Sequence, residues 1–114
     1  VYGDGLQTRD FVHVDDVADA FVRAADRGGG ERLMIGTGVA TTVTDLFHVC
    51  ADATGYAEEP VAAPARPGEV RHSVVDAARA GAVLGWRPWT TVRDGVAATV
   101  AWARERGGTA RTAP

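Results

Sequence analysis

Lysine is absent from this 114-residue chain, and all twelve basic residues are arginine. Chemistry that depends on lysine is therefore excluded within these residues, including a Walker-type phosphate loop, Schiff-base catalysis and a Tyr-x-x-x-Lys pair. The single cysteine, Cys50, rules out an internal disulfide and predicts a reducing, cytoplasmic setting. Ser73 is the only serine and has no evident base, so the sequence predicts no serine nucleophile.

Long apolar runs and an excess of positive charge are also absent. No run approaches the ~20 apolar residues of a membrane span, and no signal peptide is visible. The formal net charge of −3 predicts no general attraction to nucleic acid or to an anionic membrane. Length and 46% hydrophobic content fit one small domain. Because the chain opens without Met inside a motif-like run, we expect it to be part of a longer protein.

The beginning of the chain combines signals for a turn, a strand and a helix. Residues 3–5 are Gly-Asp-Gly, which is turn chemistry. Residues 11–14 form a β-type run that predicts a short strand. Asp15 and Asp16 then offer carboxylates to cap a helix predicted over 17–26.

Arg9 lies between that turn and that strand. Its planar guanidinium suits a phosphate or a carboxylate, so one interpretation is a contact to a diphosphate. Spacing alone favours the alternative, a surface arginine paired with Asp10 or Asp16.

The rest of the chain predicts two short strands, three helices and an extended loop. Thr42, Asp76 and Thr91 are candidate caps, and glycines follow where each helix should stop. Residues 57–70 hold three of the five prolines, so we expect a surface loop that touches a ligand. The predicted strands are 33–35 and 61–63, the predicted helices begin at Thr42, Asp76 and Thr91, and 109–114 is expected to be a disordered tail.

Arg66 and Glu69 flank a Pro-Gly turn within that loop. A cation and a carboxylate at this spacing suit a nucleotide, with arginine on phosphate and the carboxylate accepting from vicinal ribose hydroxyls. The alternative is an ordinary turn with two solvated charges.

Residues 35–47 imitate a dinucleotide-binding fingerprint, because a predicted strand, Gly36-x-Gly38 and a predicted helix follow one another. The third glycine is absent, and no strand ending in an acidic residue follows at the usual distance. We therefore do not assign a cofactor site here. The three histidines and Cys50 match no metal-ligand spacing, so no metal site is predicted, and His13 is expected to be a strand residue that pairs with a neighbouring aspartate.

Taken together, four segments resemble the last third of nucleotide-sugar epimerases and dehydratases of the extended short-chain dehydrogenase family. They are "YGDGLQTRDFVHVDDVADAFVRA", "MIGTGVATTVTDLF", "ARPGEV" and "SVVDAARAGAVLGWRP", followed by a closing helix near Trp102, and the resemblance spans about residues 1–104. It implies an α/β fold, with residues 1–108 as the small C-terminal substrate-binding lobe of a Rossmann-type enzyme. The Rossmann domain, its NAD and the catalytic Tyr-x-x-x-Lys pair would lie outside this chain.

The resemblance also implies roles for individual residues. Arg9 and Arg66 would contact the diphosphate, and Glu69 the ribose. Tyr2, Phe11 and Val43 fall where the family lines its base and ribose pocket, although the periodicity of Phe11 and Val43 also fits the core. Ser73 replaces an aromatic residue found in some epimerases, which leaves the base unassigned.

The expected function is the nucleotide-sugar-binding portion of a 4-epimerase-like enzyme that acts on a UDP- or TDP-sugar. This portion holds no catalytic residue and no cofactor of its own. Alternatives are a 4,6-dehydratase or decarboxylase of the same family, or a stand-alone, non-catalytic binding module. The resemblance implies as partners a nucleotide-diphosphate sugar, the N-terminal Rossmann domain and a second copy in a homodimer, with neither nucleic acid nor membrane. Apolar surface is expected to be exposed where the Rossmann domain would pack.

Overall fold

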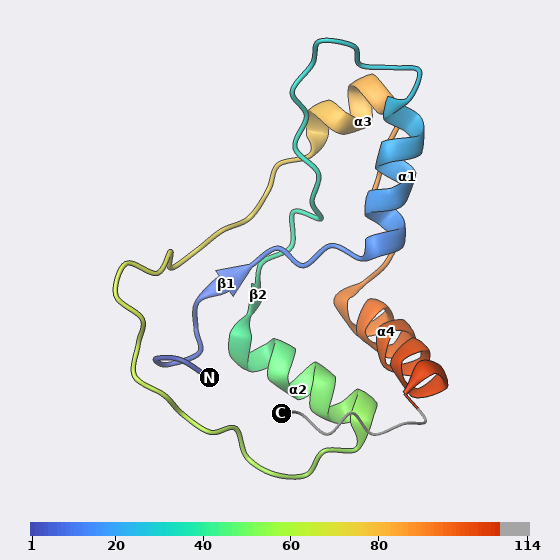
Figure 1. The fold of residues 1–114 in the computed structure, drawn as a ribbon. Helices are drawn as coiled ribbons and strands as arrows, with labels where there is room; N and C mark the ends of the chain where they lie inside the picture. Colours follow the sequence, from blue (N-terminus) through green and yellow to red (C-terminus); the bar gives the residue numbers. More distant parts are fainter. Residues whose placement is uncertain (108–114) are drawn as a thin grey trace.

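The computed structural model describes residues 1–107 and contains, within them, four helices and one two-stranded antiparallel sheet (Figure 1). Thr8 lies opposite Thr42 in the sheet, and Arg9 lies opposite Thr41. This arrangement confirms the predicted α/β class. The elements in chain order are β1 (Thr8–Arg9), α1 (Val14–Ala24), β2 (Thr41–Thr42), α2 (Val43–Thr54), α3 (Ala78–Leu84) and α4 (Val92–Arg106).

The helices pack in two pairs, α1 with α3 and α2 with α4 (Figure 1). The sheet lies between the two pairs, because β1 runs toward α1 while β2 leads directly into α2. A long loop returns from α2 past the start of the chain to α3. The tail predicted at 109–114 lies outside the described residues.

The buried core lies in the α1–α3 pair and centres on Trp86. This indole is 1% exposed, and its Nε1–H donates to the backbone oxygen of Asp16 at 2.8 Å. Ala20 of α1 and Ala80 and Leu84 of α3 complete the buried cluster. Small residues at the crossing let the two helices approach closely enough to enclose the large ring.

Asp16 is fully buried and ties α1 to the chain that enters α4. Its carboxylate accepts from the backbone N–H groups of Trp89 and Thr90, at 3.0 and 3.1 Å, and from the Thr90 hydroxyl at 2.9 Å. A buried carboxylate is tolerated when several donors satisfy it, as here. The residue predicted to cap a helix therefore organises a connector instead.

Most helix ends that depend on local chemistry are where the sequence predicts them. The hydroxyls of Thr42 and Thr91 accept from the N–H groups three residues on, at 3.0 and 3.1 Å. Gly55 and Gly85 end α2 and α3 with φ of 75° and 66°, a left-handed conformation that glycine adopts without strain. At α3 the prediction is off by one residue: Ala77 is the N-cap and makes no side-chain capping bond, and Asp76 before it accepts from the N–H of Ala78 at 2.9 Å.

Three strand predictions are wrong. Residues 33–35 form no strand, because Leu33 and Ile35 instead pack against the α1–α3 core. Residues 11–14 are not a strand either: α1 begins at Val14 and is preceded by His13, which makes no side-chain capping bond. The strand predicted at 61–63 is reduced to one bridge between Ala63 and Tyr2.

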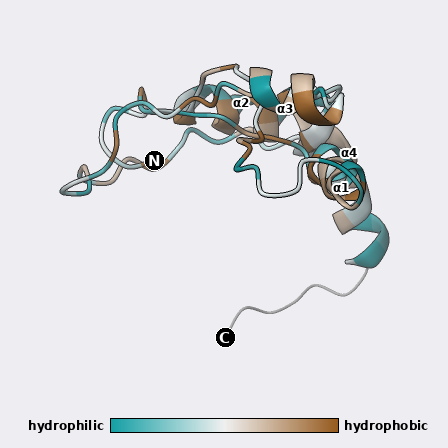
Figure 2. Cartoon of the chain, turned by 90° about the horizontal axis from the view of Figure 1, so that it is seen from above, coloured by the Kyte–Doolittle hydropathy of each residue, from teal (hydrophilic) through white to brown (hydrophobic). Residues whose placement is uncertain are grey.

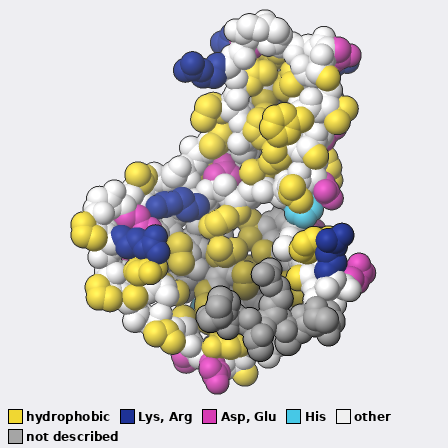
Figure 3. Space-filling view, viewed as in Figure 1, with side chains coloured by type: hydrophobic (Ala, Val, Ile, Leu, Met, Phe, Trp, Pro, Cys, Tyr) yellow, Lys and Arg dark blue, Asp and Glu magenta, His cyan; other side chains and the backbone are white. Residues whose placement is uncertain are grey.

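Much apolar surface stays exposed. Viewed from above, the described chain forms a shallow, bent layer rather than a closed ball (Figure 2). Hydrophobic side chains gather on the face seen in Figure 3 over the α1–α3 pair. Val14, Phe21 and Val22 of α1 are among the exposed apolar residues. This exposure agrees with the apolar surface expected from the sequence. Among the described residues, no helix combines the length and the hydropathy needed to cross a membrane.

We expect Asp16→Ala to lower the free energy of unfolding by about 3 kcal/mol, because buried N–H groups lose a charged acceptor. Urea titration measures this loss. Asp19→Ala is the matched control on the same helix: its carboxylate pairs with Arg23 at the surface, so the expected loss is about 0.5 kcal/mol. Equal losses in the two variants would contradict the role of Asp16.

Candidate functional site

Two segments far apart in sequence run side by side and enclose a cleft. Tyr2 bridges Ala63 and Thr8 bridges His72, both in parallel orientation. Six residue steps separate the two bridges on the first segment and nine on the second, so the second segment bows outward between them. The cleft between them has a volume of about 240 Å³ and is lined by Tyr2, Gly3, Asp4, Gln7, Ala65, Arg66, Glu69, Val70 and Arg71.

Arg66 stacks on Tyr2 across this cleft, with its guanidinium carbon 3.8 Å from the ring centroid. This distance is typical of a cation–π contact. Within residues 1–107 Arg66 has no carboxylate at ion-pair distance, whereas Arg9 and Arg71 each have one. Arg66 is therefore the cleft arginine that can take an anionic ligand without first losing an ion pair.

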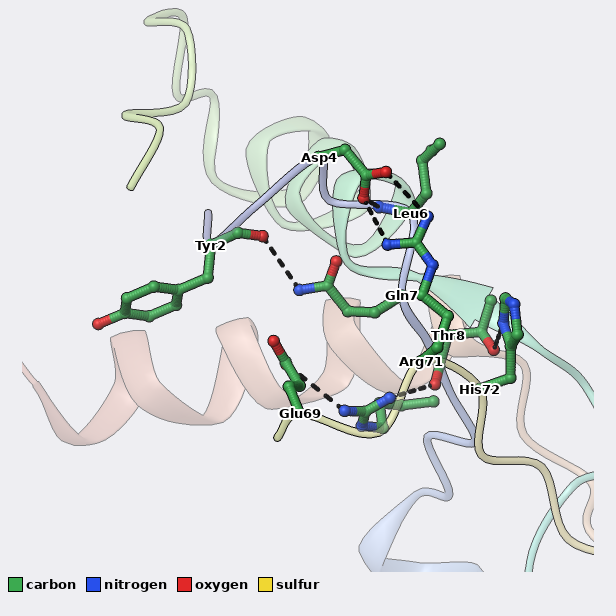
Figure 4. Close-up of polar contacts among 9 residues, drawn as sticks. Tyr2, Asp4, Leu6, Gln7, Thr8, Glu69, Arg71 and His72 are labelled. Carbon is green, nitrogen blue, oxygen red and sulfur yellow. Dashed lines mark hydrogen bonds and ion pairs between the residues drawn. The ribbon is translucent and has the colours of Figure 1, made fainter. Parts of the chain in front are cut away.

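Glu69 connects the two arginines that the sequence singles out. Its carboxylate lies 3.4 Å from Nη2 of Arg9 (Figure 4). Its backbone N–H donates to the oxygen of Arg66 at 3.4 Å. Nη1 of Arg9 also donates to the backbone oxygen of Thr8 at 2.7 Å. The structure thus brings Arg9, Arg66, Glu69 and Tyr2 together, and Arg9 reaches the cleft through Glu69.

Asp4 and Arg71 form a two-pronged ion pair across the same cleft, with both N–O distances at 2.8 Å (Figure 4). The Arg71 guanidinium, together with the N–H of Leu6, lowers the pKa of Asp4 to about 2. In the sequence Asp4 is recognisable only as part of a turn, and Arg71 belongs to no motif. The two are 67 positions apart, and no local pattern links them.

Phe11 and Val43 lie elsewhere. Phe11 lines a separate groove of about 420 Å³ formed by residues 11–14, α2 and α4. Val43 opens α2, and its backbone N–H donates to the oxygen of Gln7 at 3.1 Å. Gln7 was not singled out from the sequence, yet it is buried and lines the cleft, and its amide donates to the oxygen of Tyr2 at 3.2 Å.

The turn at residues 36–38 does not fit the pyrophosphate of a dinucleotide. Its amides are already used: Thr37 and Gly38 each donate to the carboxylate of Asp10 at 2.9 Å. Burial would raise the pKa of Asp10, but the bonds from Thr37, Gly38 and Val75 lower it below the usual value, so the group stays ionised. A carboxylate in this position would repel a phosphate.

The histidines form no metal site within residues 1–107, where no three metal-ligating side chains gather. His13 is not the predicted strand residue but precedes α1, where its ring lies 3.4 Å from the expected partner Asp15. His48 is exposed on α2.

Comparisons with known proteins identify the family to which the chain and its fold belong. The family model described as GDP-mannose 4,6 dehydratase matches residues 1–99. The UDP-glucose 4-epimerase of Mycolicibacterium smegmatis is 47% identical over 107 residues, which is 93% of this chain and 34% of that protein. The Thermotoga maritima UDP-glucose 4-epimerase with UDP-glucose superposes with a TM-score of 0.90 at 42% identity, covering 93% and 34% of the two chains. The structure of MoeE5 in complex with UDP-glucuronic acid and NAD superposes with a TM-score of 0.85 at 39% identity. The match covers 93% of this chain and 36% of MoeE5.

The fold and these matches therefore define the C-terminal part of NAD-dependent nucleotide-sugar epimerases and dehydratases. The chain belongs to the GDP-mannose 4,6 dehydratase family. It spans about a third of the length of the relatives that it matches.

The pKa of Asp4 predicts a pH effect. The pKa of Asp4 in the folded chain, about 2, lies below its ordinary value of 3.8. The contribution of Asp4 to folding stability is therefore complete above pH 3.8 and is lost as the pH falls through 2. The lowered pKa of Asp10 acts in the same direction. An NMR titration of the Asp4 carboxyl carbon should give a midpoint near 2, and Arg71→Gln should move it up toward the ordinary value. A wild-type midpoint at 3.8 would contradict the ion pair.

Proposed function

We propose that residues 1–107 form the nucleotide-sugar-binding lobe of an NAD-dependent epimerase that acts on the hexose of a UDP- or TDP-sugar. The main support for this proposal is the cleft in which Arg66 stacks on Tyr2 beside the Glu69–Arg9 pair. Arg66 has no carboxylate partner among the described residues and is therefore available to an anionic ligand. A nucleoside diphosphate offers matching chemistry: two phosphates for guanidinium groups, ribose hydroxyls for a carboxylate and an aromatic base.

The lobe supplies binding energy rather than chemistry. Anchoring the nucleoside diphosphate orients the remote sugar, and such remote energy raises the rate when it fixes the reacting carbon against the cofactor. NAD would be held by a Rossmann domain outside these residues, since the only fingerprint-like turn of residues 1–107 has its amides bound to Asp10. Its contribution when bound is to accept and return a hydride.

A second candidate is a nucleotide-sugar 4,6-dehydratase, favoured by the description of the family model itself. Epimerase and dehydratase differ in the acid and base groups around the sugar, and these groups would lie outside this chain. A decarboxylase and a stand-alone binding module are the remaining alternatives. Sequencing the upstream gene discriminates: a Gly-rich loop and a Tyr-x-x-x-Lys pair support the enzyme, whereas a stop codon or an unrelated domain supports the module. A homodimer of the complete protein and a cytoplasmic location stay predictions.

In the complete protein, Arg66→Ala should raise KM for the nucleotide sugar by about 10- to 100-fold, since one charge-assisted phosphate contact is lost. Steady-state kinetics with UDP- and TDP-sugars measures the change. Arg79→Ala is the control, because Arg79 pairs with Glu31 on the surface and lines no part of the cleft. Unchanged kinetics for Arg66→Ala would show that Arg66 does not contact the phosphates of the substrate.

The isolated 114-residue chain should bind no NAD in a calorimetric titration, whereas the complete protein should bind it. A micromolar signal from the isolated chain would show that the cofactor site has been assigned to the wrong part of the protein.

A further inference from the structure

The walls of the cleft are unequal in how firmly they are held. The turn at residues 3–6 is fixed against α2, because the backbone oxygen of Gly5 accepts from both the N–H and the hydroxyl of Thr44, at 3.0 and 3.1 Å. Gly5 has a φ of 71°, and a Cβ added to it would collide with Thr44. We call the opposite wall, residues 64–71, the arc.

The arc depends on side chains. Between its end bridges the arc makes four polar or cation–π contacts with the first segment. They are the Arg66–Tyr2 stack, the Glu69–Arg9 pair, the Arg71–Asp4 pair and one backbone bond from the N–H of Thr8 to the oxygen of Arg71. The first two use groups that the proposed function assigns to ligand, so a bound ligand would compete with them. The Asp4–Arg71 pair is the side-chain contact that a ligand need not disturb.

Asp4 can hold the arc at a defined place relative to the fixed turn, because it is anchored in that turn and contacts Arg71 of the arc. One of its carboxylate oxygens accepts from the N–H of Leu6 at 2.9 Å, which holds the side chain within its own turn. Both oxygens then meet Arg71 at 2.8 Å, and a two-pronged contact constrains direction as well as distance. Both side chains are about half exposed, so the pair contributes little to global stability.

We propose that the Asp4–Arg71 pair is a positioning clamp, which holds the arc at a fixed distance from the turn and thereby sets where Arg66 and Glu69 meet a nucleoside diphosphate. The clamp also neutralises Arg71 and keeps it from binding phosphate. The ligand named here rests on the proposed function; the clamp itself rests on the geometry alone.

The Asp4→Asn variant distinguishes a positioning role of the ion pair from a simple effect of charge on ligand affinity. The substitution frees Arg71 and makes the cleft one unit more positive, so an effect of charge alone would tighten the binding of a diphosphate. A lost clamp would weaken it, because the arc is no longer held in place. The two interpretations predict opposite signs.

The binding experiment uses calorimetry of UDP and UDP-glucose with the complete protein. We expect Asp4→Asn and Arg71→Gln each to raise Kd about tenfold, and the double variant to be no weaker than either single one. The charge swap Asp4→Arg with Arg71→Asp should recover most of the affinity. Arg93→Gln removes a comparably exposed pair with Asp52 and should leave Kd unchanged. Tighter or unchanged binding by Asp4→Asn overturns the clamp.

Amide hydrogen exchange tests the clamp without a ligand. In Asp4→Asn we expect faster exchange across residues 64–71 and no change across residues 86–90, and unaltered exchange in the arc overturns the clamp. If the wild-type protein binds no nucleoside diphosphate sugar, the proposed function fails, and the exchange result still decides the clamp.

Discussion

The carboxylate of Asp10 joins three stretches of chain on which the candidate site depends. It accepts from Thr37, Gly38 and Val75, and thereby fixes the backbone directly after Arg9 to the chain that carries Glu69. The junction is tight, because a Cβ at Gly36 would lie 2.6 Å from that of Val75. With few paired strands among the described residues, this lobe uses one ionised side chain where a larger sheet would use a ladder of backbone bonds.

The two halves of the molecule are built differently. The α1–α3 half encloses Trp86 in a buried cluster, whereas α2 has no fully buried residue and α4 buries only Gly95. Apolar side chains are consequently spread over the outside of the described chain, as Figures 2 and 3 show. Half-buried faces of this kind are characteristic of a lobe that packs against further protein.

Features set by local chemistry could be predicted from the sequence, and those set by distant contacts could not. The caps at Thr42 and Thr91 depend on residues three positions away, so the pattern contains them. The strand predicted at 33–35 is absent, because these residues pack on the core instead of pairing with another strand. At the site, the resemblance correctly grouped Tyr2, Arg66 and Glu69 but also suggested Phe11 and Val43, which do not line the cleft. The contact between Asp4 and Arg71 is created only by the fold.

The unequal spacing of the two end bridges has a consequence for how such proteins diversify. Because the arc is pinned at Ala63 and His72, residues between these points can be inserted, deleted or exchanged without altering the register of either flank. Lengthening a loop closed at both ends costs only a logarithmic amount of entropy. Evolution can therefore reshape this wall for a different sugar nucleotide while the helices and the buried tryptophan stay as they are.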